Sequence, residues 1–403
     1  MRLVILKFGG TSLGNSKKIK HVSKIIKSYY QKKNKVIVVA SAMSGVTNEL
    51  IKRSKEISKN FEKSEYDVLV SSGEQISCSL IAGALLELGL NARSWISWQL
   101  PILTDENFSS SRIETINTKE IFSFIKKGGI PVVTGFQGIT KNKRITTLGR
   151  GGSDASAIAL AKFFNADSCV IYTDVEGVYT TDPNSNVKAK KIDKISYEEM
   201  LEMSSLGAKV MQPISIQDAM INNIKINVKS TFSKKNGTEI ISENEIIKKK
   251  VITGITYTKN EAKITLIGVT DKPGVAASIF KPLAQNNINV DMVVQNISDD
   301  GKKTDITFTI KKEDLNYALR LIKRNKKILY KKIVQDDKVS KVSIVGVGMV
   351  ATPGVTYRMF QALAKKKINI MVISTSEIKI SVLIDQKNIK EAIKALHKEF
   401  NLG

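Results

Sequence analysis

Residues 146–154 read Thr-Thr-Leu-Gly-Arg-Gly-Gly-Ser-Asp and lead directly into the alanine-rich run at 155–161. Glycine lets a backbone approach a ligand closely, and the free N–H groups at a helix start suit an anion. Arg150 adds a planar fork that can hold a carboxylate or a phosphate through two hydrogen bonds. Ser153 and Asp154 are residue types typical of a helix N-cap. The stretch therefore predicts either an anion site at a helix start or an ordinary glycine-rich turn with its cap.

Length and charge set the broad class of the protein. The chain has 403 residues, of which 42% are hydrophobic, so we expect more than one domain with sizeable cores. Its formal net charge of +25 would suit nucleic-acid binding, but the lysines are dispersed and no basic block is interleaved with aromatic residues. We therefore favour a solvated, lysine-rich surface, whose field would also attract an anionic substrate.

Cysteine, histidine and hydropathy argue against several other classes. Cys78 and Cys169 lie in apolar runs and are expected to be core thiols in a reducing compartment. His21 and His397 are the only histidines, which argues against histidine catalysis and histidine metal sites. The N-terminal apolar run is too short for a signal peptide, and no stretch approaches the roughly 20 apolar residues of a membrane span. We therefore expect a cytoplasmic protein.

Apolar runs alternate with helical patterns over residues 1–232. Strands are expected at 3–6, 36–40, 131–136 and 169–174. A helix is expected to start at Ser72, where Gln75 completes a capping box, and to stop at Gly89. Such alternation indicates an α/β fold with a mainly parallel sheet that helices cover on both faces. Functional loops should then lie at the carboxyl ends of the strands.

An internal repeat follows a polar, charged connection at 233–250. Pro273-Gly274-Val275 matches Pro353-Gly354-Val355, and further apolar pairs keep the same offset. Each copy reads β-α-β-β-α-β, and repeated small α+β units after a larger domain suggest a regulatory tail. Residues 346–351 also fit the dinucleotide fingerprint G-x-G-x-x-A, but the equivalent loop of the first copy, 268–272, lacks that pattern. We therefore discount dinucleotide binding.

Glycine-bearing loops recur at strand ends, without the G-x-x-x-x-G-K-[ST] pattern of a P-loop enzyme. Lys7 ends the first strand, where its ammonium can reach a phosphate cradled by the amides of Gly9 and Gly10. Glu74 is a candidate partner for a substrate ammonium, or a carboxylate in a first helical turn that complements the helix dipole. Lys209 is a candidate second phosphate-neutralising cation, or a plain helical lysine.

Phosphoryl transfer to a carboxylate suits this set of residues. A carboxylate acceptor is already ionised near pH 7 and needs no general base, so the protein has only to position the reactants and neutralise charge. A magnesium ion would be held chiefly by the nucleotide phosphates and water, which explains the absence of a dense acidic cluster in the sequence.

In its ordered motifs the chain closely resembles the aspartokinases, amino acid kinases with C-terminal ACT domains. The motifs are KFGGTS (7–12), ASAMSGVT (40–47), SSGE (71–74), TLGRGGSD (147–154), TD (173–174), YTTDP (179–183) and GAKV (207–210). Single motifs are weak signals, but the ordered set is specific and spans essentially the whole chain. The resemblance implies a three-layer α/β/α kinase domain at 1–232, a linker at 233–250 and two βαββαβ ACT domains at 251–330 and 331–403.

The resemblance also implies an activity. It is ATP-dependent phosphorylation of the β-carboxylate of L-aspartate to 4-phospho-L-aspartate, the first step toward lysine, threonine and methionine. A competing hypothesis is a catalytically weak amino-acid sensor that uses only the ACT pair. The intact Lys7, Glu74, Arg150 and Asp154 argue against that hypothesis.

Site residues follow from the resemblance position by position. Catalytic roles are implied for Lys7, Arg150, Asp154 and Lys209. ATP contacts are implied for Lys7, Phe8, Gly9, Gly10, Ser12, Thr173, Asp174, Tyr179, Asp182 and Lys209. Aspartate contacts are implied for Ser41, Thr47, Glu74, Arg150, Gly152 and Ser153, and no protein metal ligand is implied. Asn184 and Lys229 stand where many members have Arg, which puts one nucleotide contact in doubt.

The ACT pair implies feedback by lysine, threonine or both. Effectors would bind between paired ACT units, which implies an ACT-mediated homodimer or larger oligomer, with or without a separate C-terminal regulatory subunit. The alternative is an ACT pair that only dimerises. The candidate effector residues are Asp271, Lys272, Pro273, Gly274, Val275, Ala276, Gln295, Asn296, Thr352, Pro353, Gly354, Val355, Asn369 and Ile370.

Overall fold

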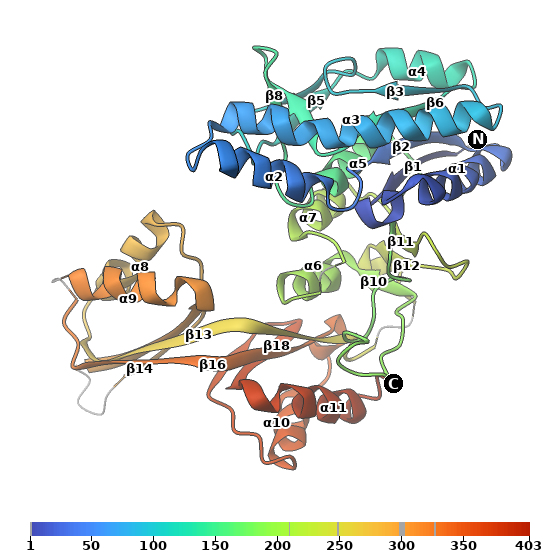
Figure 1. Ribbon diagram of the computed structural model, residues 1–403. Helices are drawn as coiled ribbons and strands as arrows, with labels where there is room; N and C mark the ends of the chain where they lie inside the picture. Colours follow the sequence, from blue (N-terminus) through green and yellow to red (C-terminus); the bar gives the residue numbers. More distant parts are fainter. Residues whose placement is uncertain (1, 209, 248–249, 298–302, 326–327) are drawn as a thin grey trace. The chain divides into compact units, whose positions relative to one another are not determined.

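The computed structural model describes residues 2–208, 210–247, 250–297, 303–325 and 328–403 (Figure 1). These residues form two compact units. Unit 1 lies within 1–178, 191–205 and 209–247, and unit 2 within 179–190, 206–208 and 248–403. Two short segments from the expected kinase domain, 179–190 and 206–208, therefore belong to the unit that contains the repeats.

Unit 1 is built on an eight-stranded sheet in the order β10-β12-β11-β9-β1-β2-β6-β3. The strands from β11 to β3 are parallel to one another, and β12 and β10 run antiparallel to them. The strands are β1 (Leu3–Phe8), β2 (Lys35–Ala40), β3 (Ala92–Trp95), β6 (Ile130–Thr134), β9 (Ser168–Thr173), β10 (Lys194–Ser196), β11 (Ile226–Ser230) and β12 (Thr238–Ile241).

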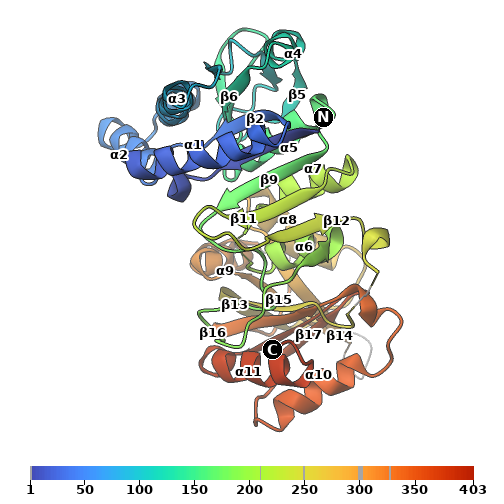
Figure 2. The same ribbon diagram turned by 90° about the vertical axis from the view of Figure 1, so that its right-hand side faces the viewer.

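Helices cover both faces of this sheet, which confirms the predicted three-layer α/β/α sandwich. Figure 2 shows α1 (Ser16–Gln31) and α3 (Lys63–Glu87) on one side and α5 (Gly152–Phe163) and α7 (Pro213–Ile221) on the other. The remaining helices of the unit are α2 (Val46–Ile57), α4 (Lys119–Lys126), α6 (Tyr197–Ser205) and short 3-10 turns at Gly10–Leu13 and Glu243–Glu245.

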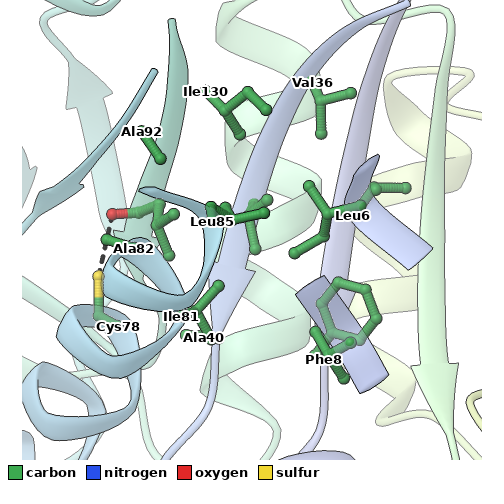
Figure 3. Packing of buried hydrophobic residues seen from close by; sticks show 14 of the residues in the cluster. Leu6, Phe8, Val36, Ala40, Cys78, Ile81, Ala82, Leu85, Ala92 and Ile130 are labelled. Atoms are coloured by element: carbon green, nitrogen blue, oxygen red, sulfur yellow. Dashed lines mark hydrogen bonds between the residues drawn. The ribbon is translucent and has the colours of Figure 1, made fainter. Parts of the chain in front are cut away.

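The core beneath α3 is apolar and closely packed. Figure 3 shows Cys78, Ile81 and Leu85 of α3 against Leu6 and Phe8 of β1. The Cys78 thiol donates to the carbonyl of Val132 over 2.9 Å, and burial raises its pKa to about 12. Cys78 and Cys169 are both buried free thiols, as expected.

Helix α3 differs from the sequence expectation in two ways. It starts at Lys63 instead of Ser72, because the hydroxyls of Ser71 and Ser72 donate to carbonyls three residues back inside the helix instead of capping it. It is also long and apolar enough to cross a membrane by length and composition, although half of its most apolar window is buried in the core. Its end is as predicted, with Gly89 at φ +75° just beyond Leu88.

Two further parts of unit 1 differ from the sequence prediction: a small sheet that was not predicted, and a strand within the predicted linker. A second, four-stranded sheet has the order β5-β4-β7-β8 and leads from β8 into the Arg150 loop. Its strands are β4 (Ile102–Thr104), β5 (Ile113–Ile116), β7 (Gln137–Ile139) and β8 (Ile145–Thr147). The expected linker at 233–250 contains β12, which pairs with β11 and β10 in the main sheet.

Unit 2 is a six-stranded sheet in the order β14-β15-β13-β16-β18-β17, with helices α8 to α11. Its elements are β13 (Gly254–Thr270), α8 (Val275–Gln285), β14 (Val290–Ile297), β15 (Lys303–Lys311), α9 (Leu315–Arg324), β16 (Lys332–Val345), α10 (Val355–Ala364), β17 (Val372–Thr375), β18 (Lys379–Asp385) and α11 (Ile389–Glu399). Short 3-10 turns lie at Lys312–Asp314, Val347–Met349 and Gln386–Asn388.

The two repeat modules interleave instead of following one another. One core contains residues from Ala262 to Ile328, whereas the other combines Ile252 and Ile255 with residues from Val342 to Leu402. The first module is therefore inserted after the N-terminal strand segment of the second module, around Ile252 and Ile255, and before the rest of that module. The expected boundary between 251–330 and 331–403 is corrected accordingly, since β13 and β16 each contribute to both modules.

The glycines at 346 and 348 have a packing role within unit 2. A Cβ at Gly346 would lie 2.3 Å from the carbonyl oxygen of Val251, and one at Gly348 would lie 2.5 Å from that of Lys250. These glycines let the chain at 250–252 pass close by, and α10 begins only at Val355. The discounted dinucleotide fingerprint is thus explained by backbone packing.

Candidate active site

Lys7 and Asp154 form a buried ion pair in unit 1. Strand alternation puts Lys7 on the opposite face of β1 from Leu6 and Phe8, toward α5, whose first turn carries Asp154. The Lys7 Nζ lies 2.6 Å from Asp154 Oδ1, and the two residues are 9% and 7% exposed. A buried ammonium with one carboxylate partner can turn to an incoming phosphate without first shedding a full water shell.

The glycine pair after β1 differs from the expected phosphate cradle. The N–H of Gly9 donates to the carbonyl of Tyr172 over 3.1 Å and extends the ladder between β1 and β9, so it is already used. A Cβ at Gly10 would lie 2.8 Å from the carbonyl oxygen of Ala42. Gly10 is therefore required where the loop after β1 meets the loop after β2. Of the expected pair of amides, only that of Gly10 is left for a phosphate.

Two other residues predicted to contact ATP, Phe8 and Ser12, have side chains that already contact other residues of the protein. Phe8 is fully buried and stacks on Tyr172 with ring centroids 4.8 Å apart. The Ser12 hydroxyl is buried and lies 2.6 Å from the Thr231 hydroxyl. Both side chains are thus engaged within the protein, and the ATP contacts of Phe8 and Ser12 stay predictions.

Glu74 is a buried carboxyl group in the middle of α3, not in a first helical turn as expected. Its Oε1 accepts the N–H of Ala42 over 3.1 Å, and its buried Oε2 has no hydrogen-bond partner among the described residues. Burial raises its pKa to about 7, against the opposing effect of the Ala42 hydrogen bond. A buried oxygen without a donor suits a ligand that brings N–H groups and positive charge.

The loop after β2 is fixed by the same helix. The Ser77 hydroxyl of α3 donates to the Ser41 carbonyl over 2.6 Å, and the N–H of Ser41 donates to the Phe8 carbonyl over 3.1 Å. Thr47 is half-buried in the first turn of α2, directly after Gly45 and Val46. Glu74 and Ser77 thus hold the segment that carries two of the predicted aspartate residues.

The Arg150 loop joins β8 to α5. Gly149 and Gly151 have φ of +72° and +74°, and Gly151 rather than Ser153 or Asp154 is the helix N-cap. The expected Ser–Asp cap is therefore wrong, because the left-handed glycine ends the turn and both side chains fall within the first helical turn. The Arg150 side chain is exposed.

A chain of contacts connects these loops at one edge of the sheet. Gly135, after β6, donates to the Ala40 carbonyl over 3.0 Å, and a Cβ there would lie 2.9 Å from the Ser153 hydroxyl. Gly152 is packed as tightly against Phe136. Segments at 9–12, 40–47, 135–136 and 149–154 thus meet at the carboxyl ends of parallel strands, where α/β proteins bind ligands.

The remaining predicted nucleotide residues are spread over both units. Thr173 is the last residue of β9, and its hydroxyl donates to the carboxylate of the next residue, Asp174, over 3.1 Å. Tyr179 and Asp182 belong to unit 2, and Asp182 accepts a hydrogen bond from Tyr257 over 2.9 Å. Lys209 lies outside the described residues.

Comparison with known proteins decides the family. Residues 2–230 match the amino acid kinase family, and residues 264–325 and 342–400 match an ACT domain. An aspartate kinase of Stutzerimonas stutzeri is 46% identical over 404 residues, which cover 100% of this chain and 98% of that protein. An aspartokinase of Corynebacterium glutamicum is 42% identical over 409 residues, with 100% and 97% covered. The chain belongs to the aspartate kinases.

Solved structures of aspartate kinases agree with this assignment. The Synechocystis aspartate kinase is 37% identical, with a TM-score of 0.56, and 99% of this chain and 69% of that chain are covered. The structure of Escherichia coli aspartokinase III in complex with aspartate and ADP is 23% identical, with a TM-score of 0.81 and coverage of 99% and 100%. The latter similarity supports the fold.

Unit 2, which contains the two ACT modules, has a cavity of about 550 Å³. The cavity is lined by residues 349–356 and by Thr375, Ser376, Glu377 and Ile380. It contains Thr352, Pro353 and Gly354 of the predicted effector set. The side chain of Val275 packs in the core of the first module, and its place in the effector loop stays a prediction.

The other predicted effector residues are distributed over unit 2. Asp271, Ala276 and Ile370 are half-buried, and Val355 lines the cavity from the core of the second module. The exposed ones are Lys272, Pro273, Gly274, Gln295, Asn296 and Asn369.

Asp67 and Ser77 also serve this site through hydrogen bonds from α3, and neither was predicted as a site residue. Both share the buried face of α3 with Glu74 at helical spacing. Because the helix was expected to begin at Ser72, the upstream part of that face was not considered. Extending the pattern to Lys63 would have revealed the Asp67–Glu74 pair.

Proposed function

We propose that unit 1 transfers the γ-phosphoryl group of ATP to the β-carboxylate of L-aspartate and forms 4-phospho-L-aspartate, the first step toward lysine, threonine and methionine. The observation that carries this proposal is the buried, unpaired oxygen of Glu74. It suits the α-ammonium of the substrate, and the guanidinium of Arg150 suits the α-carboxylate. With both α-groups held, the side-chain carboxylate is left as the reacting group.

The transfer is a direct displacement. A β-carboxylate oxygen attacks the γ-phosphorus, the bond from that phosphorus to the β–γ bridging oxygen breaks, and ADP leaves. The Lys7 ammonium neutralises charge on the transferring phosphoryl group. The Asp154 carboxylate, 2.6 Å from that ammonium, orients the Lys7 side chain. We assign the same neutralising role to Lys209, as expected from the sequence. Ser41, Thr47, Gly152 and Ser153 complete the aspartate pocket in this proposal.

A magnesium ion would accompany ATP. No group of three or more His, Cys, Asp or Glu side chains is clustered in the part of the chain that the structure describes, and Asp154 is paired with Lys7. This donor set fits an ion held mainly by nucleotide phosphates and water. When bound, the ion offsets phosphate charge. In this proposal Gly10, Thr173 and Asp174 of unit 1 serve the nucleotide, whereas the nucleotide contacts of Tyr179 and Asp182 stay sequence predictions.

Regulation belongs to unit 2 in this proposal. Lysine, threonine or both act as feedback effectors through the ACT modules, in a cytoplasmic homo-oligomer. Escherichia coli aspartokinase III has been crystallised with lysine and aspartate, which supports an amino-acid effector for a chain of this fold.

A hydroxylamine trap tests the proposed reaction, because hydroxylamine converts an acyl phosphate into a hydroxamate. We expect product only when the protein, ATP, magnesium and L-aspartate are all present. Lys7→Met keeps a side chain of similar length but removes its charge, so it should abolish turnover. Lys20→Met, on the exposed surface of α1, is the control and should not. Wild-type protein that gives no hydroxamate above background would contradict the proposal.

A further inference from the structure

Asp67 is a fully buried carboxylate near the start of α3. Its Oδ2 accepts the N–H groups of Ser109 and Thr147, each over 2.8 Å. Its Oδ1 accepts the hydroxyls of the same two residues over 3.1 and 2.7 Å. Hydrogen bonds to a buried ionised acceptor are among the stronger ones in proteins, so the carboxylate fixes two separate segments of chain.

Both segments border the Arg150 loop. Thr147 is the last residue of β8, which α3 passes closely (Figure 1), and the chain reaches Arg150 three residues later. Ser109 has φ of +69°, and its carbonyl oxygen lies 3.2 Å from the position of a Cβ at Gly149. The N–H of Ser111 also donates to the Thr147 carbonyl over 2.9 Å. Asp67 therefore determines where the Arg150 loop leaves the small sheet.

Asp67 and Glu74 are connected through the helix itself. Seven residues separate them, which is about two turns, so they lie on the same face. One holds the segments beside Arg150, and the other holds the loop at Ala42 and presents its free oxygen. The α-ammonium and α-carboxylate of an amino acid share one carbon atom, so the two groups that bind them must keep a fixed separation.

We propose that Asp67 is a positioning residue, which uses α3 to set Arg150 at the correct distance from Glu74 for the α-carboxylate of the substrate. This inference rests on the proposed roles of Arg150 and Glu74. It assigns Asp67 to the aspartate side of the reaction and predicts little effect on ATP.

Two substitutions of Thr147 that change the side chain only slightly test the inference. Thr147→Val removes the hydroxyl that donates to Asp67 and keeps the shape, whereas Thr147→Ser keeps the hydroxyl. We expect Thr147→Val to raise the KM for aspartate by about tenfold, the effect of one hydrogen bond to a charged group, with the KM for ATP unchanged within about twofold. Thr147→Ser should behave like the wild type.

Asp67→Ala is the stronger variant, because it removes both acceptor oxygens and leaves the N–H groups of Ser109 and Thr147 without their acceptor. We expect a larger rise in the KM for aspartate than with Thr147→Val. The control is Thr104→Val, which removes a buried hydroxyl bonded to Thr146 in the same small sheet without touching Asp67. It should lower thermal stability and leave the KM for aspartate unchanged.

The outcomes separate this inference from the proposed function. Wild-type protein that turns over aspartate, together with a Thr147→Val variant whose KM values for aspartate and ATP both stay normal, would overturn the positioning role alone. Equal rises in both KM values, or the same change in Thr104→Val, would also overturn it, because they indicate a general structural role. Wild-type protein without aspartate-dependent turnover would overturn the proposed function.

Discussion

At Glu74 the protein keeps a carboxyl group where its charge is poorly solvated. Burial raises its pKa from 4.5 to about 7, so the folded protein holds a proton there that the unfolded chain releases at lower pH. The contribution of this group to stability is therefore greatest below pH 4.5, decreases as the pH rises toward 7, and is constant above that. The difference amounts to about 3 kcal/mol, since each pKa unit corresponds to about 1.4 kcal/mol.

Glu74→Gln should remove this dependence, because an amide does not titrate. In ligand-free wild-type protein, urea unfolding should show that unit 1 loses stability between about pH 5 and about pH 7. We expect this loss to be smaller by about 2 kcal/mol in Glu74→Gln. Parallel pH profiles for the two proteins would show that Glu74 ionises normally in the fold.

Arg150 offers a second test at the scale of one residue. Arg150→Lys keeps the charge but replaces a planar fork with a point charge, so the two-pronged contact to the α-carboxylate is lost. Initial rates should show a KM for aspartate raised by about tenfold or more, with a much smaller change in the KM for ATP. Arg144→Lys, in the exposed turn before β8, is the matched control. Equal effects on both substrates would assign Arg150 to a different role.

The residues of the site were predictable in type but not in pairing. Lys7, Glu74, Arg150 and Asp154 were found because their motifs and strand-end positions are local features of the sequence. The Lys7–Asp154 pair joins residues 7 and 154, which meet only once β1 and α5 have packed. The hydrogen bond from the Gly9 N–H to the Tyr172 carbonyl was equally unpredictable from the sequence, because it depends on the register between β1 and β9.

At the level of elements, the buried side chain of Lys341 connects strands of the two ACT modules through ion pairs. Lys341 of β16 is 6% exposed; its ammonium contacts Asp291 of β14 and lies 3.4 Å from Glu261 of β13. Burial raises the pKa of Glu261, and Lys341 opposes that rise. Met292 and Val339 lie beside this group in a small apolar cluster. The group thus lies where the shared strands pass from one module to the other.

Lys341→Met should destabilise unit 2 by about 3–5 kcal/mol, because Glu261 is then buried without a cation. Adding Glu261→Gln should recover most of that loss, since the uncompensated charge is gone. Urea unfolding of the single and double variants, with Lys338→Met as an exposed control on the same strand, provides the measurement. Additive losses in the double variant would contradict a coupled pair.

The elements of the fold were predicted where the evidence in the sequence is local. Continuous apolar runs gave β1, β2, β6 and β9 with small errors at their ends. The start of α3 was missed because serines that look like caps can satisfy their hydroxyls inside a helix. The interleaving of the ACT modules was missed because β13 and β16 each contribute to both cores. No local sequence pattern marks the residue at which such a strand leaves one core and enters the other.

At the scale of the whole molecule, regulation should be measurable in the full chain. In our proposal lysine, threonine or both bind the ACT modules and slow the reaction. Rates measured with each amino acid alone and with both together should show inhibition in at least one case. Glu377→Gln, at the cavity of the second module, should weaken inhibition by an amino acid whose ammonium binds there. Rates that neither amino acid changes would leave the ACT pair without a feedback role.

In our proposal Glu74 recognises the α-ammonium of aspartate while the side-chain carboxylate of the substrate reacts. The most direct test compares kcat/KM for L-aspartate and for succinate, which lacks the ammonium, in wild-type protein and in Glu74→Gln. We predict that the wild type prefers aspartate by about tenfold or more and that the variant loses this preference, because ammonium and carboxylate act as a pair. An undiminished preference for aspartate in Glu74→Gln would contradict this role of Glu74.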